Sequence, residues 1–197
     1  MRKVRPIRMV KTTYHEIDLI KLIVFNIKLN MAENNSDLWD QDYPSALTIE
    51  RGILDDDTYS LIEYDLVKGF IVKKTRLFGK PFKDIPWKYK GGQPLYITWF
   101  GVDPKYQGKG FGKSLIRFIK AYAALKAHGS IRTLVDSDNI IAIKLLESFG
   151  FNKVNDMTYE YLERPHYALE LKINKYYGRK EDKLKQFYQD QEEENKR

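Results

Sequence analysis

One short stretch, Gln107-Gly108-Lys109-Gly110-Phe111-Gly112, constrains the fold of this chain more than any other. The apolar run 95–102 stands before it and is typical of a strand. Apolar side chains recur at helical spacing after it, at Leu115, Ile116, Phe118, Ile119, Tyr122 and Ala123. A strand, a glycine-rich turn and a helix in this order place free N–H groups behind a loop whose glycines carry no Cβ. The segment therefore predicts a site for a phosphorylated ligand.

Spacing separates this turn from two other phosphate-binding loops. A P-loop, G-x-x-x-x-G-K-[ST], needs a glycine where Gln107 stands. The dinucleotide pattern G-x-G-x-x-G begins at Gly108 but meets Lys113 where its third glycine belongs. The pattern that remains is Q-x-x-G-x-G, with Gln107, Gly110 and Gly112 as its fixed positions.

A second segment follows at a matching distance. Residues 139–151 read N-x-x-A-x-x-x-L-x-x-x-G-F, with Asn139 at the start, Leu146 in the middle and Gly150-Phe151 at the end. With these two motifs the chain resembles the GNAT superfamily, the Gcn5-related N-acetyltransferases. Leu146 departs from the family pattern, because many members carry there a tyrosine that protonates the departing thiolate.

The resemblance implies both a fold and a co-substrate. The fold is α/β, a GNAT-type mixed and mostly antiparallel sheet with one splayed parallel strand pair and flanking helices. We expect it over residues 1–174, followed by a charged C-terminal helix or tail over 175–197. The co-substrate is acetyl-CoA, with its pyrophosphate in the glycine turn and its pantetheine arm along the preceding strand. The implied cofactor-binding residues are Phe100, Gly101, Val102, Gln107, Gly108, Lys109, Gly110, Phe111, Gly112, Lys113 and Asn139.

Acetyl transfer to an amine also needs a general base and a proton for the thiolate. Leu146 has no transferable proton, so Tyr159 and Tyr161 are candidate acids, although packed strand aromatics explain both as well. Asp136 is a candidate base, as is Asp138, and a capping role at the next helix explains these aspartates equally. No serine stands in a nucleophile elbow, which favours direct transfer over an acyl-enzyme.

Composition limits the remaining classes. The chain has 197 residues, a net charge of +7 and no cysteine, which fits a single cytoplasmic domain without disulfides or thiolate metal sites. The three histidines lack metal-ligand spacing, so we expect no metal. No apolar run is long enough to span a membrane. Basic residues gather around the glycine turn, but no nucleic-acid-binding signature appears, so we do not expect nucleic acid as a partner.

The acceptor side carries an acidic segment between residues 33 and 57. Its acidic residues are Glu33, Asp37, Asp40, Asp42, Glu50, Asp55, Asp56 and Asp57, against the single base Arg51. In the family this region lines the acceptor cleft, so an acidic wall would attract a cationic amine. Trp39, Tyr43 and Trp87 could form an apolar floor. A solvated acidic loop explains the same charges.

Two function classes stay open. The first is an acetyl-CoA-dependent N-acetyltransferase that acts by direct transfer on a primary amine: polyamine-like, aminoglycoside-like or peptide. The second, motivated by Leu146 and the unsettled base, is a catalytically weak acyl-CoA-binding module that acts as a sensor or scaffold. Many family members dimerise, so a homodimer is a candidate assembly.

Local signals predict the other elements. Thr13 and Glu16 have the spacing of a capping box before a helix. Ser45 caps a short helix that we expect to end at Gly52. Strands over 59–64 and 66–77 form a hairpin, in which Gly69 marks a bulge or a close approach. Residues 80–93 carry prolines and paired glycines and are expected to form a loop.

Overall fold

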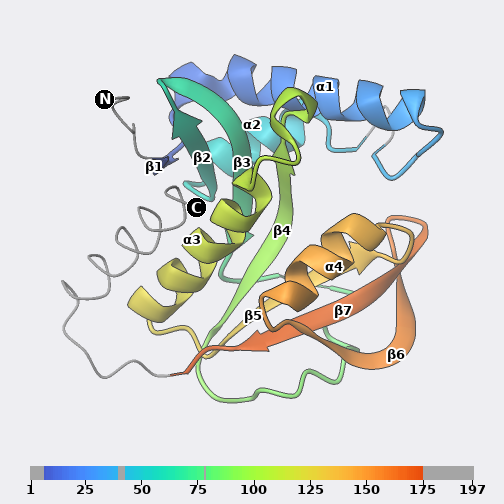
Figure 1. Cartoon of the computed structure of the whole chain (residues 1–197). Helices are drawn as coiled ribbons and strands as arrows, with labels where there is room; N and C mark the ends of the chain where they lie inside the picture. Colours follow the sequence, from blue (N-terminus) through green and yellow to red (C-terminus); the bar gives the residue numbers. More distant parts are fainter. Residues whose placement is uncertain (1–6, 40–42, 78, 175–197) are drawn as a thin grey trace. The chain divides into compact units, whose positions relative to one another are not determined.

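The computed structural model describes residues 7–39, 43–77 and 79–174. Figure 1 shows the helices and strands in chain order. They are β1 (Arg8–Lys11), η1 (Tyr14–Glu16), α1 (Ile17–Glu33), α2 (Ala46–Leu54), β2 (Thr58–Glu63), β3 (Leu66–Lys74), β4 (Pro94–Val102), η2 (Pro104–Tyr106), α3 (Phe111–Leu125), β5 (Ser130–Asp136), α4 (Ile140–Ser148), β6 (Asn152–Tyr161) and β7 (Arg164–Lys172).

The strands form a mixed sheet in the order β1-β2-β3-β4-β5-β7-β6. The pair β4–β5 is parallel, with Pro94–Ile97 in register with Ser130–Thr133. The β1–β2, β2–β3, β5–β7 and β6–β7 pairs are antiparallel. The predicted fold class, a mostly antiparallel sheet with one parallel pair and flanking helices, is confirmed.

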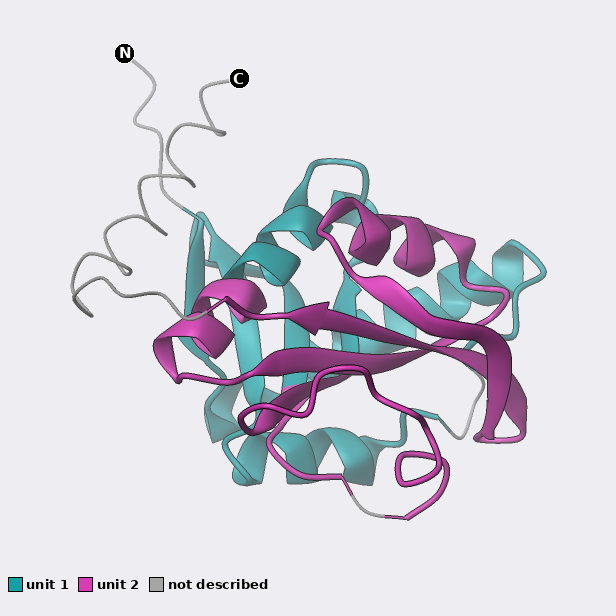
Figure 2. Ribbon diagram, turned by 90° about the horizontal axis from the view of Figure 1, so that it is seen from below, with its two compact units in different colours: residues 1–72, 99–118, 181–197 teal, residues 73–98, 119–180 magenta. Residues whose placement is uncertain are grey.

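The chain divides into two compact units (Figure 2): residues 1–72, 99–118 and 181–197 in the first, 73–98 and 119–180 in the second. The prediction of one acetyltransferase domain over residues 1–174 stays a prediction. The predicted charged helix or tail over 175–197 lies outside the described residues.

Unit 1 is built around α1. Glu16 accepts a hydrogen bond from the Thr13 backbone N–H at 2.7 Å, so the predicted capping box forms at the entrance to the helix. One face of α1 packs with α2, β3 and Trp99 of β4 in an apolar cluster. This core consists of Ile17, Ile20, Ile23, Val24, Ile27, Ile49, Ile53, Phe70, Val72 and Trp99. The predicted helical face therefore anchors the carboxyl end of β4.

The predicted end of α2 at Gly52 is wrong, because the helix continues to Leu54. Asp56 takes the left-handed conformation with φ 60°, and Asp57 N–H donates to the Gly52 carbonyl at 3.0 Å, which closes the helix. A Cβ at Gly52 would lie 3.1 Å from Thr58 Oγ1. Gly52 therefore serves close packing against β2 and not helix termination. The strand expected over 66–77 likewise stops early, at Lys74.

Unit 2 is covered on one face by the predicted loop before β4. Ile85 and Trp87 of this loop pack with Tyr96, Val154 and Ala168 of the strands. The end of α4 lies over the other face of the sheet. A Cβ at Gly150 would be 3.5 Å from the side chain of Leu171. Leu171 and Ala168 are three positions apart on β7, so their side chains point to opposite faces. In Figure 2 the loop and α4 lie on opposite sides of the magenta strands.

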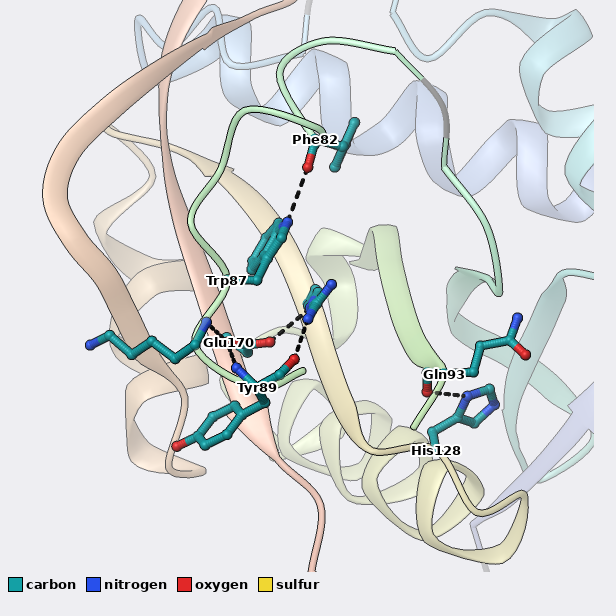
Figure 3. A network of polar contacts seen from close by, with 8 residues as sticks. Phe82, Trp87, Tyr89, Gln93, His128 and Glu170 are labelled. Atoms are coloured by element: carbon teal, nitrogen blue, oxygen red, sulfur yellow. Dashed lines mark hydrogen bonds and ion pairs between the residues drawn. The ribbon is translucent and has the colours of Figure 1, made fainter. Parts of the chain in front are cut away.

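A buried ion pair fastens this loop to the sheet (Figure 3). Glu170, 2% exposed, accepts from Arg132 Nε at 2.7 Å and from the backbone N–H of Lys88 at 2.8 Å and of Tyr89 at 3.2 Å. Arg132 Nη2 donates to the Tyr89 carbonyl at 2.5 Å, and its guanidinium lies 4.8 Å from the Trp87 ring centroid. The ion pair therefore provides hydrogen-bond partners for backbone groups of the loop that no neighbouring strand supplies.

Candidate active site

The direction of the chain after β4 is set by hydrogen bonds of the Asp103 backbone and of its carboxylate. Its backbone N–H donates to the Lys68 carbonyl of β3 at 2.9 Å. Its carboxylate accepts from Asn26 Nδ2 of α1 and from the Lys105 N–H of η2, each at 3.0 Å. The chain therefore leaves the strand in one defined direction, toward the glycine turn.

The glycine turn presents an open backbone at the start of α3. Gly108 and Gly110 have φ values of +74° and +86°, and a Cβ on either would have no atom within 4 Å. The first helical bond runs from Ser114 N–H to the Gly110 carbonyl at 3.1 Å. The N–H groups of Phe111, Gly112 and Lys113 precede that bond and form the unsatisfied first turn. With the helix dipole, this arrangement favours an anion.

Positive charge surrounds the turn. The Tyr106 ring has Lys68 Nζ at 3.6 Å from its centroid, Lys109 Nζ at 5.5 Å and Lys105 Nζ at 5.6 Å. Its other neighbour is Phe111, the first residue of α3, at 6.3 Å between centroids. Ammonium groups gathered beside exposed backbone N–H groups increase the attraction for a ligand with several phosphates.

Backbone groups near the carboxyl end of β4 face β3 and the opposite edge of the strand in turn. A Cβ on Gly69 would lie 2.5 Å from the Gly101 carbonyl oxygen, so Gly101 faces β3, as Asp103 does. The close approach predicted at Gly69 is confirmed, and the β2–β3 register shifts beside it. Because backbone groups alternate along a strand, those of Phe100 and Val102 face the opposite edge. The ladder between β4 and β5 ends at Ile97 and Thr133, before those residues.

In unit 2, Asn139 is the N-cap of α4. Its Oδ1 accepts from the Ala142 N–H at 3.0 Å. The helix ends at Ser148, and Gly150 follows in the left-handed region with φ +87°, so that the Phe151 N–H donates to the Leu146 carbonyl at 3.2 Å. Leu146 is fully buried. Several residues of the second motif thus have clear structural roles, and the core takes an apolar side chain at Leu146.

Three of the catalytic candidates, Asp136, Tyr159 and Tyr161, differ in how their polar atoms are engaged. Asp136 is 8% exposed, and its carboxylate accepts from the Asp138 N–H at 2.9 Å and from Arg164 Nε. The Tyr159 hydroxyl accepts from Asn155 Nδ2 at 2.9 Å. No hydrogen bond joins the Tyr161 hydroxyl to another described residue, and burial raises the pKa of this phenol. Tyr161 therefore stays open for chemistry, whereas Asp136 and Tyr159 already have partners.

Arg164 was not predicted from the sequence as part of this region. It stands far from Asp136 along the chain, and only the β5–β7 pairing, which opposes Asp136 with His166, brings it there. In the sequence, the position of Arg164 at the start of a strand does not indicate that it pairs with Asp136.

The acidic segment is partly neutralised within unit 1. Glu50 pairs with Lys21 Nζ at 2.5 Å and Asp56 with Lys11 Nζ at 2.6 Å. Trp39 meets Trp99 edge-on at 6.3 Å. Trp87 belongs to unit 2, where it is 5% exposed and donates to the Phe82 carbonyl (Figure 3), so it is a core residue. Asp40 and Asp42 lie outside the described residues.

No cluster of histidine, cysteine, aspartate and glutamate side chains among the described residues could hold a metal ion. None of the helices described is long and apolar enough to cross a membrane.

Comparisons with known proteins agree with this geometry. The family model for the acetyltransferase (GNAT) family matches residues 34–151. The chain therefore belongs to the GNAT acetyltransferase family. A search of curated protein sequences gave no significant match.

Solved structures with the same fold are distant in sequence. An acetyltransferase of the GNAT family from Streptococcus agalactiae 2603 has a TM-score of 0.73 at 17% identity, covering 86% of this chain and 96% of its own. A putative acetyltransferase from Staphylococcus aureus Mu50 has a TM-score of 0.66 at 23% identity, covering 84% and 99%. The PaiA N-acetyltransferase from Thermoplasma acidophilum, in complex with coenzyme A, has a TM-score of 0.60 at 15% identity, covering 84% and 98%.

Proposed function

We propose that the protein is an acetyl-CoA-dependent N-acetyltransferase, over residues 1–174, that transfers an acetyl group directly to a primary amine. The glycine turn carries this proposal, because it combines three N–H groups ahead of the first helical bond with glycines in the left-handed region. Membership of the GNAT family supports an acetylated donor, as does the coenzyme A bound to the Thermoplasma relative.

Each part of the donor has proposed contacts. The pyrophosphate is held by the backbone from Gln107 to Lys113, with Lys109 and Lys113 adding charge. The pantetheine arm runs along β4 and uses the edge of Phe100 and Val102, whereas Gly101 faces β3. Asn139, whose Oδ1 caps α4, is a further proposed contact for the donor.

The proposed acceptor is a cationic primary amine, such as a polyamine-like, aminoglycoside-like or peptide amine. Support comes from the amino-acid sequence between residues 33 and 57, which carries eight acidic residues against the single base Arg51. Trp39 is half-buried beside Trp99 and offers an aromatic surface to an ammonium group.

A second candidate function is a catalytically weak acyl-CoA-binding module that acts as a sensor or scaffold. Two observations favour it: Leu146 is buried in the core, and both carboxylate oxygens of Asp136 have donors. Such a module would bind acetyl-CoA but release no thiol.

Two measurements separate these functions. Calorimetry with acetyl-CoA tests the donor site, and absence of binding at millimolar concentration contradicts both. A panel of amines with a thiol-reactive dye then tests catalysis. Because the chain contains no cysteine, the dye reports only the thiol of released coenzyme A. Robust thiol release with any amine of the panel removes the non-catalytic candidate.

Location and assembly belong to the same proposal. The absence of cysteine suits the reducing cytoplasm, which we propose as the location. A homodimer is the proposed assembly, and sedimentation measurements would test it.

A further inference from the structure

A group of polar side chains lies where β5 ends, beside the turn that joins β6 to β7. His166 is the cross-strand partner of Asp136 on β5 and of Tyr159 on β6. Directly opposite residues project to the same face of a sheet, and Tyr161 follows Tyr159 with the same alternation. These four side chains therefore share one face of unit 2, the face that the loop before β4 covers.

The hydrogen bonding of His166 determines which ring nitrogen is basic. Nδ1 lies 2.9 Å from the Arg164 carbonyl oxygen. Because a carbonyl only accepts, the neutral ring carries its proton on Nδ1, which leaves a lone pair on Nε2. No described residue donates to Nε2.

His166 is 8% exposed. A lone pair that no described residue engages is the arrangement that a general base requires.

Tyr161 lies directly beside this imidazole. The two ring centroids are 5.4 Å apart with an interplanar angle of 82°, and the Phe82 ring holds Tyr161 from another side at 5.5 Å. The Tyr161 hydroxyl has no hydrogen-bond partner among the described residues. Burial raises the pKa of this hydroxyl, so it stays protonated at neutral pH and can act as a proton donor.

The position of the group fits a reacting centre. β5 is the second strand of the parallel pair, and Asp136 is its last residue. In open α/β sheets, ligands bind outside the carboxyl ends of parallel strands.

We propose that His166 is the general base and Tyr161 the general acid of acetyl transfer, an assignment that rests on the proposed N-acetyltransferase function. The neutral amine nitrogen forms a bond to the thioester carbonyl carbon and gives one proton to His166 Nε2. The carbon–sulfur bond breaks, and the thiolate takes the proton of the Tyr161 hydroxyl. The imidazolium then returns its proton to the tyrosinate, directly or through water, so both residues are regenerated.

The test compares kcat for thiol release in variants of the full chain. His166→Gln keeps a side-chain donor for the Arg164 carbonyl but removes the base, and Tyr161→Phe keeps the ring but removes the hydroxyl. Each should lower kcat by about 100-fold or more while the acetyl-CoA Kd stays within about threefold. The matched control is Tyr64→Phe, which removes the hydroxyl of an exposed tyrosine in the turn between β2 and β3 and should leave kcat within about twofold.

A further readout is chemical rescue. Added imidazole should restore at least about tenfold of the rate lost in His166→Ala.

The outcomes distinguish this assignment from the proposed function. Turnover that survives within about threefold in both His166→Gln and Tyr161→Phe overturns the acid–base pair and leaves the N-acetyltransferase standing. Absence of wild-type turnover with every amine of the panel overturns the proposed function, and the pair with it.

Discussion

The side-chain Nε2 of Gln107 donates to the carbonyl oxygen of Val102 at 3.0 Å, which fastens the first residue of the glycine turn to the last residue of β4. Because this bond fixes where the turn begins, Gln107→Leu should weaken acetyl-CoA binding by about fivefold, the equivalent of one hydrogen bond of about 1 kcal/mol. Calorimetry gives the Kd. The matched control is Gln93→Leu, since Gln93 Nε2 also donates to a backbone carbonyl, that of Thr75 at 3.2 Å, and should leave the Kd unchanged.

Gly110→Asp should abolish acetyl-CoA binding at concentrations that saturate the wild type, with an affinity loss of about 100-fold or more. The new carboxylate would stand where we place phosphates and would repel them. Gly79→Asp is the control, because Gly79 has a φ of +87° and equally open surroundings, so backbone strain is matched. Equal losses of affinity in the two variants would show that strain, not charge in a phosphate site, is the cause.

Gly69→Ala should destabilise the fold by about 2–4 kcal/mol, because the added Cβ would meet the Gly101 carbonyl oxygen at 2.5 Å and a backbone atom cannot rotate away. Denaturant unfolding measures the change. Gly91→Ala is the comparison, since a Cβ there has no atom within 4 Å. A shift in Gly69→Ala no larger than in the comparison would contradict the close approach between β3 and β4.

Glu170→Leu should destabilise the protein by about 3–5 kcal/mol, because it leaves the buried guanidinium of Arg132 without its carboxylate. It should also speed hydrogen exchange at the Lys88 and Tyr89 amides, which now donate to Glu170. Glu50→Leu removes the exposed pair with Lys21 instead and should change stability by less than about 1 kcal/mol. Unchanged exchange at both amides would show that the loop is held by other contacts.

The pH dependence of stability should contain a contribution from His128. Burial lowers the pKa of this imidazole, and the nearby charge of Lys73 adds to the effect. The unfolded chain therefore binds a proton at a higher pH than the folded chain, so stability decreases as the pH falls through about 6.5. His128→Gln should flatten this decrease in urea midpoints between about pH 8 and pH 5, whereas His15→Gln, at an exposed position, should keep it. If the urea midpoint of His128→Gln falls with pH as steeply as that of the wild type, other groups cause the decrease.

Local patterns were sufficient where the signal and its cause lie in the same few residues. The capping box of Thr13 and Glu16 forms as predicted, because its partners are three residues apart. Ser45 caps α2 by accepting from the Thr48 N–H, for the same reason. Gly52 shows the opposite case: a helix-ending glycine and a glycine required by packing look identical in sequence, and only the distance to Thr58 separates them.

The sequence by itself determined the family and the order of elements, and it singled out the turn from Gln107 to Gly112 by the spacing of its glycines. Tertiary structure decided which polar side chains remain available. Asp136 is held by Arg164 and Tyr159 by Asn155, whereas His166 Nε2 and the Tyr161 hydroxyl keep no protein partner among the described residues. The physical reason is that a hydrogen-bond partner of a catalytic candidate can come from another strand, and its identity depends on a register that no local pattern encodes.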